Sequence, residues 1–343
     1  MSTDIFIFPP QTPDYLLSFQ FSSWYPTFSS ISIKSTIIRP LDQAFTEYLD
    51  SDRIFVPEGS ENVPAESSLS DDDDEEDDAA IGQHFSFPDL DERIRETIKE
   101  YGAVFPKLNF SSPKDASWVL PPSSPLKCTS PSDVYILLKS SDYVSHDLSV
   151  YTVFEGCQFD LLNPPSYELE LVLRKWYPID RSREFRCFVR DNRLIGISQR
   201  DTNFYDFMNE PETQQKIAET LKRFWEEDVK SQWHGQQDYI FDVLMTRDLF
   251  RGHVLDFNPY APRTDPLLFT YEELLVIFMQ ESSSTLDLRV IDSPSHPATR
   301  RNAPAHQHNM LPIEALALSS GRDIEEFSDL WKENIQQSMN DDD

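Results

Sequence analysis

The segment YIFDVLMTRDLFRGHVLDFNPY constrains the fold most, because it contains two strand-like runs separated by a polar turn. The runs Tyr239–Met245 and 253–257 are apolar, which predicts a β-hairpin. Asp242 lies inside the first run, and Asp256 and Asn258 share one face of the second. A buried acid is costly unless it is paired, and three oxygen side chains on adjacent strands suit Mg²⁺. We therefore predict a metal-binding hairpin, with ordinary hydrogen bonding of Asp242 as the alternative.

The charge of the chain limits its partners. Among 343 residues, 60 are Asp or Glu and 30 are Lys or Arg, so the net charge is −30. Such a surface repels nucleic acid and anionic membranes and favours basic proteins as partners. Any nucleotide site must therefore create a local positive pocket. No apolar run is long enough to span a membrane and no secretion signal is evident, so we expect a cytoplasmic monomer.

The three cysteines do not suggest a metal site or a disulfide framework. Cys128, Cys157 and Cys187 are far apart, and none belongs to a Cys-x-x-Cys motif. His306 and His308 lie in a polar, proline-rich tail without a further ligand nearby, so we interpret that tail as solvated.

Strand-like and helix-like runs are mixed without regular strand–helix–strand alternation, which indicates an α+β fold with antiparallel sheets. Ser132 and Thr270 are the expected caps of two helices. The expected helices cover 41–49, 90–101, 132–142, 212–229, 270–278 and 323–335, and the expected strands outside the hairpin cover 103–107, 126–128, 169–173, 184–189 and 193–198.

An acidic block at 71–78 interrupts this pattern inside a serine-rich stretch at 57–82. Like charges at this density repel one another and bury no apolar area, so we predict a disordered spacer. The alternative is a docking segment for a basic partner.

Basic residues gather in the middle of the chain, against the acidic background. Lys107 ends the short run FPK, Arg174 begins RKWY, and Arg200 follows another strand. Alternation along 184–189 places Glu184 and Arg186 on one face, where Arg186 pairs with Glu184 or another acid in the simplest interpretation. Scattered cations that converge on metal-binding carboxylates are what a triphosphate requires.

The order of these segments resembles an ATP-grasp fold, in which two α+β lobes hold ATP between them. REFRCFVRDNRLIGISQRD, VFPKLNFSSPKDASWVL, LLKSSDYVSHDL and LDFNPYAPRTDPLLFTYEEL more specifically resemble the cell division cycle protein 123 family. The resemblance implies an N-terminal part of the small lobe with a partner surface at 1–58, an acidic disordered loop at 59–84 and a small nucleotide-binding lobe at 85–168. A hinge with the large lobe at 169–290 and a mobile tail with a short helix at 291–343 would follow.

The resemblance also implies a site. Lys107 would contact phosphates, the backbone of 111–114 would lie nearby, the hinge 173–177 would meet the adenine, and Arg174 or Lys175 would lie near the base or ribose. The loop SSPKDASW lacks the glycine of many ATP-grasp enzymes, and the second lysine of the fold is either Lys127 or Lys139. The implied nucleotide contacts are Lys107, Asn109, Ser111, Arg174, Lys175, Trp176, Tyr177, Glu184, Arg186, Arg200 and Asp256, and the implied Mg²⁺ ligands are Asp242, Asp256 and Asn258.

Members of this family are assembly chaperones of eukaryotic translation initiation factor 2. The resemblance thus implies an ATP- and Mg²⁺-binding chaperone, linked to translation initiation and the cell cycle, without ligase turnover. It would bind the gamma subunit and promote its joining to the alpha subunit and assembly of the heterotrimer. We place the partner surface on the aromatic N-terminus and on 41–57, although Phe45, Tyr48 and Phe55 could equally complete a core. The alternatives are a carboxylate–amine ligase and an acidic scaffold with a degenerate site.

Overall fold

The computed structural model describes residues 6–51, 56–61, 85–121, 123–160, 162–280 and 286–302. It consists of two compact units, Met1–Pro294 and Ser295–Asp343, and a 3₁₀ turn at Pro297–Asn302 is the described element of the second. The acidic block at 71–78 and the helix expected at 323–335 lie outside the described residues. No helix within the described ranges is both long and apolar enough to cross a membrane.

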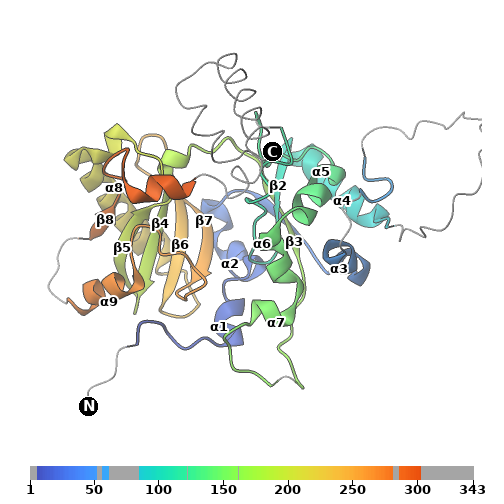
Figure 1. Cartoon of the computed structure of the whole chain (residues 1–343), viewed down its shortest axis with the longest axis horizontal. Coiled ribbons are helices and arrows are strands. Elements are labelled where there is room, and N and C mark those ends of the chain that lie inside the picture. The colour runs from blue at the N-terminus through green and yellow to red at the C-terminus, as the bar shows by residue number, and fades with distance from the viewer. Residues whose placement is uncertain are drawn as a thin grey trace, which may run out of the picture. The chain divides into compact units, whose positions relative to one another are not determined.

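A three-stranded sheet forms one half of the first unit (Figure 1). Its central strand is β3 (Leu171–Lys175), which pairs antiparallel with β1 (Ser35–Ile38) and β2 (Val104–Lys107). Leu171 and Leu173 face one core cluster and Val172 faces another, because side chains alternate along a strand. The first of these clusters also contains buried residues of α3 (Gln43–Asp50), α4 (Pro88–Tyr101) and α5 (Pro131–Lys139).

Two boundaries in this half differ from the sequence prediction. The strand expected at 126–128 is wrong: Leu126 has a φ of 62°, outside the extended region, and Cys128 forms an isolated bridge with Val104. The cap expected at Ser132 is also wrong. Ser130 caps α5 in a capping box with Asp133, and the chain leaves the helix at Lys139 before α6 (Asp142–Ser145) and α7 (Val150–Val153).

The second sheet has five strands in the order β7 (Gly252–Pro259), β6 (Tyr239–Met245), β4 (Glu184–Arg190), β5 (Arg193–Gln199) and β8 (Asp287–Arg289). β6 and β7 form the predicted hairpin. All pairings are antiparallel except the short edge pairing of β5 with β8, which is parallel. The α+β fold with antiparallel sheets in two lobes, as expected of an ATP-grasp protein, is therefore confirmed, with one parallel edge strand added.

The two faces of this second sheet bury different clusters. Phe185, Cys187 and Val189 face a cluster that includes residues of α8 (Pro211–Phe224) and the π turn Trp225–Val229. Phe188 faces the other side and packs with residues of α9 (Tyr271–Met279). Thr270 caps α9 as predicted, in a capping box with Glu273. The alternation predicted for β4 therefore holds, and the buried Cys187 is a free thiol.

The aromatic N-terminus is part of the core. α1 (Pro13–Leu17) and α2 (Phe21–Phe28) lie between the two sheets (Figure 1), and the Trp24 ring is 5.2 Å from the Phe257 ring of β7. Phe21 and Trp24 are almost fully buried. The prediction that these aromatics are exposed for a partner is therefore wrong, because large apolar rings gain most by leaving water.

The same holds for α3. Phe45 and Tyr48 are fully buried, which confirms the alternative that they complete the core of this lobe. Phe55 lies outside the described residues.

Candidate nucleotide and metal site

A row of charged side chains crosses the second sheet on one face. Arg186 on β4 is the register partner of Asp242 on β6, and Asp242 is in turn the partner of Asp256 on β7. The register shifts directly after Asp242, and this bulge lets Asp242 and Asp256 share a face while Val243 and Val254 remain paired in the core. The local irregularity thus brings the two predicted metal ligands together.

Asp242 is held by two arginines. Arg186 donates from Nε and Nη2 to the two carboxylate oxygens at 2.7 and 2.9 Å, and Arg200 Nε lies 3.2 Å from Oδ2. Burial alone would raise the pKa of Asp242, but the two guanidinium groups hold it well below its usual range. Arg200 also donates to Glu184 at 2.7 Å. Arg186 therefore pairs with Asp242 and not with Glu184. The sequence interpretation allowed Glu184 or another acid as its partner, and the second option is the one observed.

Lys107 reaches this row from the other sheet. Its Nζ donates to Asp256 Oδ2 at 2.7 Å, and its side chain is fully buried, whereas that of Asp256 is 20% exposed. Arg174 lies on the same face of the three-stranded sheet as Lys107, and both lie over the Phe21 ring, at 5.1 and 5.7 Å from its centroid. Residues of both sheets therefore form the site, and the Phe21 ring from the N-terminal segment packs beneath its two cations.

Arg174 has unused hydrogen-bonding capacity. Its Nε and Nη2 are buried without a hydrogen-bond partner. Desolvation lowers the pKa of this guanidinium, and the Asp256 carboxylate acts in the opposite direction. Buried donors without a partner are rare in folded proteins, and a water, an ion or a bound ligand can satisfy them.

The loop after β2 adds another cation. Lys114 is an exposed residue of a mostly half-buried loop, and the pKa of its ammonium is lowered to about 8, first by desolvation and then by the Arg200 cation. The carboxylates of Glu184, Asp242 and Asp256 act in the opposite direction. The ammonium therefore lies within the electrostatic reach of the charged row. The role of the 111–114 backbone at the phosphates stays a prediction.

Two of the predicted contact residues have side chains with other partners. The Asn109 amide donates to Glu168 O at 2.7 Å and accepts from Glu170 N at 2.9 Å, which ties the end of β2 to the chain before β3. The Ser111 hydroxyl donates to Asp147 at 2.8 Å. In contrast, the Asn258 Nδ2 is buried without a partner.

The hinge at 173–177 comprises the last three residues of β3 and the two that follow it. Trp176 N donates to Ala103 O at 2.9 Å, and Lys175 lies over the Tyr177 ring, which is half-exposed. Of the two candidates for the second lysine, Lys127 lies over the Trp176 ring at 5.2 Å. The other, Lys139, donates to carbonyl groups at the end of α3, so it stabilises that helix terminus and lies apart from the charged row.

Sequence reasoning missed two buried carboxylates beside this site. Glu170 accepts from Ser22 N at 3.0 Å and from Gln20 at 3.2 Å, which fixes the start of α2. Asp147 accepts from the backbone of Phe110 and Ser111. The position of Glu170 inside the apolar run ELELVL could have indicated a buried carboxylate. Nothing in the sequence around Asp147 distinguishes it from an exposed acid.

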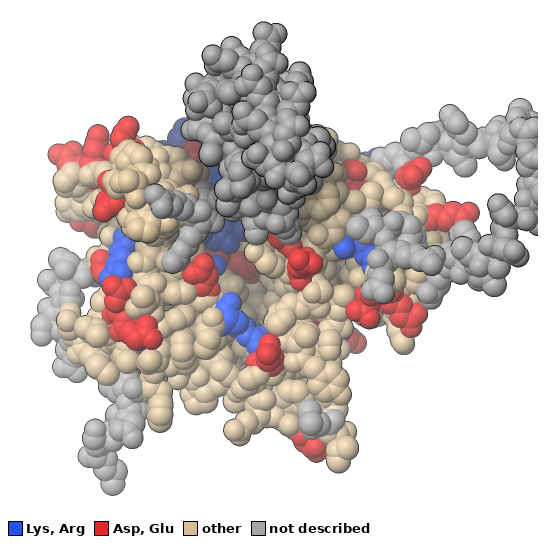
Figure 2. All heavy atoms as spheres, in the orientation of Figure 1, with Lys and Arg blue, Asp and Glu red and all other residues tan. Residues whose placement is uncertain are grey.

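The charged row carries more positive than negative side chains, within a chain whose net charge is −30, while the two carboxylates beside the row, Asp147 and Glu170, accept hydrogen bonds from backbone N–H groups. Figure 2 shows many carboxylates and few cations on the face it presents, which matches this overall balance. An excess of cations together with unpaired donors suits an anionic ligand. The cations are Lys107, Lys114, Arg174, Arg186 and Arg200, and the carboxylates are Glu184, Asp242 and Asp256.

The predicted Mg²⁺ ligands Asp242, Asp256 and Asn258 lie on adjacent strands and carry the oxygen atoms that Mg²⁺ prefers. Both Asp242 oxygens accept from Arg186, and one Asp256 oxygen accepts from Lys107. Within the described ranges, no cluster of three or more His, Cys, Asp or Glu side chains is arranged to hold a metal. A metal at this hairpin would therefore need ligand atoms from the anion as well, as Mg²⁺ does when it bridges phosphates.

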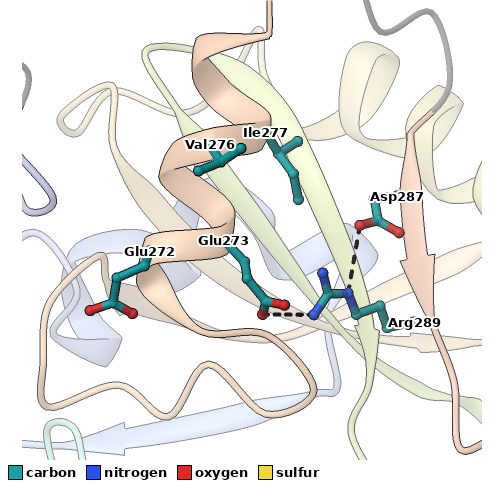
Figure 3. Close-up of a pocket in the computed structure, with 6 residues that line it drawn as sticks. All are labelled: Glu272, Glu273, Val276, Ile277, Asp287 and Arg289. Carbon is teal, nitrogen blue, oxygen red and sulfur yellow. Dashed lines mark hydrogen bonds and ion pairs between the residues drawn. The ribbon is translucent and has the colours of Figure 1, made fainter.

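One hollow of the first unit lies near this site and another lies between α9 and β8. A cavity of about 200 Å³ is lined by Ser111, Asp147 and Asn258, so it adjoins the charged row. A groove of about 310 Å³ lies between α9 and β8 (Figure 3), where Arg289 pairs with Glu273 at 2.8 Å and with Asp287 at 3.6 Å. The groove is lined by Glu272, Glu273 and Asp287 against the single cation Arg289, so it is negative and unsuited to an anion.

Comparisons with known proteins give the family. A family model described as D123 matches residues 24–319. The chain is 36% identical over 333 residues to the translation initiation factor eIF2 assembly protein of Schizosaccharomyces pombe, with 95% of this chain and 98% of that protein covered. It is 36% identical over 350 residues to the protein of the same name from Xenopus laevis, with 96% and 99% covered.

A solved structure agrees with these sequences. The structure of Cdc123 from Schizosaccharomyces pombe matches with a TM-score of 0.67 and 34% identity, covering 83% of this chain and all of that chain (100%). The resemblance to the cell division cycle protein 123 family is thereby confirmed. The chain belongs to the D123 family.

Proposed function

We propose that this chain binds ATP together with Mg²⁺ between its two sheets, and that it serves as an assembly factor for eukaryotic translation initiation factor 2. The observation that carries the nucleotide part is the excess of cations over carboxylates in the charged row, where Lys107, Arg174 and Arg186 are buried, within a strongly acidic chain. Burying like charges together is unfavourable without a counter-ion, and a triphosphate supplies one.

Each residue of the site would have a defined part. Lys107 and Arg174 would contact phosphates, since one is buried against Asp256 and the other has unpaired donors. Arg186 and Arg200 would orient Asp242 and add positive potential. The hinge at 173–177, with Lys175, Trp176 and Tyr177, would meet the base, and Glu184 the ribose side.

Mg²⁺ would be held by Asp242, Asp256 and Asn258. The metal would neutralise phosphate charge and fix the conformation of the bound nucleotide. Asn109 and Ser111 would act through the backbone of the loop that they stabilise, because their side chains bond within the protein.

The assembly role rests on the names of the relatives, which are called assembly proteins of translation initiation factor eIF2. We propose that this chain binds the gamma subunit of that factor in the cytoplasm, as a monomer, and promotes its joining to the alpha subunit. Nucleotide binding would favour one arrangement of the two lobes to the extent that ATP binds that arrangement more tightly. The strongly acidic surface suits a protein partner with basic regions and not nucleic acid.

Calorimetry tests the nucleotide part directly. We expect ATP to bind the wild-type chain in the presence of Mg²⁺ and at least tenfold more weakly in EDTA. Asp256→Asn should abolish the effect of Mg²⁺. Asp248→Asn is the matched control, since Asp248 lies in the exposed turn of the same hairpin and bonds Thr246. Equal ATP affinity in the wild type and Asp256→Asn would contradict the site.

A pull-down tests the assembly part. The isolated gamma subunit should be retained by the wild-type chain, and ATP–Mg²⁺ should change the amount retained. The carboxylate–amine ligase alternative predicts ADP formation that depends on a small carboxylate and an amine. Rapid ADP release under those conditions, without any effect of the gamma subunit, would favour the ligase and contradict the assembly role.

A further inference from the structure

Asp147 is a buried carboxylate that organises the loop beside the candidate site. One of its oxygens accepts from the backbone N–H groups of Phe110 and Ser111, both at 2.8 Å, and the other accepts from the Ser111 hydroxyl at 2.8 Å. Its side chain is fully buried. These bonds join segments 36 residues apart, so they fix the position of the turn and do not merely cap a local helix.

The turn that Asp147 holds is constrained on both sides. Leu108 N donates to Ser111 O at 3.0 Å, which closes the turn directly after Lys107. Tyr167 donates to the Asp147 carbonyl at 2.8 Å, and its ring stacks on that of Phe110. Asp147 is thus itself fixed, as a residue must be if it is to position another.

The turn also separates two parts of the candidate site. Lys107 precedes it and pairs with Asp256, and Lys114 follows it within electrostatic reach of Arg200. Ser111 and Asp147 line the cavity of about 200 Å³ opposite Asn258. A shift of the turn would therefore move one cation relative to the other and open this wall of the cavity.

We propose that Asp147 is a positioning residue of the nucleotide site, which holds the Phe110–Ser111 turn so that the following loop reaches the phosphates. The inference rests on the proposed binding of ATP–Mg²⁺. Positioning of this kind is required because binding groups must be held within a fraction of an ångström of their working geometry. Asp147 acts through the hydrogen bonds that it accepts from this turn.

The test compares three variants by calorimetry with ATP–Mg²⁺. Asp147→Ala removes all three acceptor contacts and should lower affinity at least tenfold. Asp147→Asn should stay within about threefold of the wild type, because its amide oxygen can accept both N–H groups and the Ser111 hydroxyl can turn to accept from its NH₂. Asp91→Ala is the control: Asp91 is a buried acid of the same lobe that accepts from Tyr135 at 2.6 Å.

Asp91→Ala should lower the unfolding temperature, as Asp147→Ala does, yet leave the affinity of the folded protein unchanged. Equal affinity losses in both variants would show a general effect of instability and overturn the proposal, as would an affinity of Asp147→Ala within twofold of the wild type. If Asp147→Ala does not fold, hydrogen exchange on the wild type decides, since rapid exchange of the Phe110 and Ser111 amides would contradict the geometry. Absence of ATP binding in the wild type would instead refute the proposed function.

Discussion

The ion pair between Lys107 and Asp256 predicts that replacing either partner weakens ATP binding, but that only replacing Asp256 strongly lowers the stability of the fold. The Lys107 side chain is fully buried, whereas that of Asp256 retains 20% exposure. Removing the lysine leaves a carboxylate that water can still reach, while removing the carboxylate leaves a buried ammonium without its partner. Burying an uncompensated charge is the larger cost, so the two partners are not equivalent.

The perturbation is the pair of near-isosteric variants Lys107→Met and Asp256→Asn. For Lys107→Met, the loss of the pair and of the contact with the Phe21 ring is offset by no longer desolvating an ammonium, so we expect a change within about 1.5 kcal/mol of either sign. For Asp256→Asn, breaking a buried pair on this side should cost about 3 kcal/mol. The unfolding temperature should fall by about 6 °C or more for Asp256→Asn and by much less for Lys107→Met.

The assays are thermal unfolding and calorimetry with ATP–Mg²⁺ on the same samples. Lys107→Met should lose at least tenfold in ATP affinity although it is stable. Asp248→Asn, in the turn of the same hairpin, should change neither quantity appreciably. If Lys107→Met is destabilised as much as Asp256→Asn, the reasoning from unequal burial is refuted. If it is stable and binds ATP normally, the assignment of Lys107 is refuted.

Three further predictions concern charge, packing and helix termini. Arg186 and Arg200 depress the pKa of Asp242 below its unfolded value of about 3.9. The ionised Asp242 therefore stabilises the fold fully above about pH 3.9, and this contribution is lost as the pH falls further. The difference in unfolding temperature between wild type and Asp242→Asn should therefore be constant from pH 7 to 5 and shrink below pH 4; a constant difference down to pH 3 would contradict it. Phe21→Leu and Phe19→Leu should both lower stability by about 1–2 kcal/mol, yet calorimetry should show weaker ATP binding only for Phe21→Leu, since Phe21 alone of the two underlies the cations. Lys139→Met should lower the free energy of unfolding in urea by about 1–3 kcal/mol, because it removes the ammonium that donates to the Tyr48 and Leu49 carbonyl groups at the end of α3; an unchanged midpoint would contradict that role.

The hairpin was predictable because its signal is local. Apolar alternation on both sides of a polar turn indicates two paired strands, and the acids inside those strands mark a site. The register that pairs Asp242 with Asp256 was not predictable, because it depends on a bulge whose residues look like ordinary strand. A single residue of slip would have turned one of the acids into the apolar core.

The pairing of Lys107 with Asp256 could not be predicted from pattern alone, since 149 residues separate them. Family resemblance supplied both residues as members of one site, without saying that they contact each other. The prediction of the residue that caps α5 was wrong for a different reason. Ser130 and Ser132 are both good caps by type, and the choice is made by Asp133, which completes a capping box only with Ser130.

The N-terminus shows how burial changes the meaning of a sequence feature. Its aromatic residues suggested a surface for a partner, yet the Phe21 ring lies against both Lys107 and Arg174. The backbone N–H of Phe21 donates to Asn109 O at 2.9 Å. Glu170 fixes the start of the same helix through Ser22. An apolar floor with a negative ring face lowers the cost of holding two cations together, whereas a polar floor would compete with the ligand for their donors. The segment is therefore part of the candidate site, and a partner surface has to be sought on other, exposed aromatic side chains.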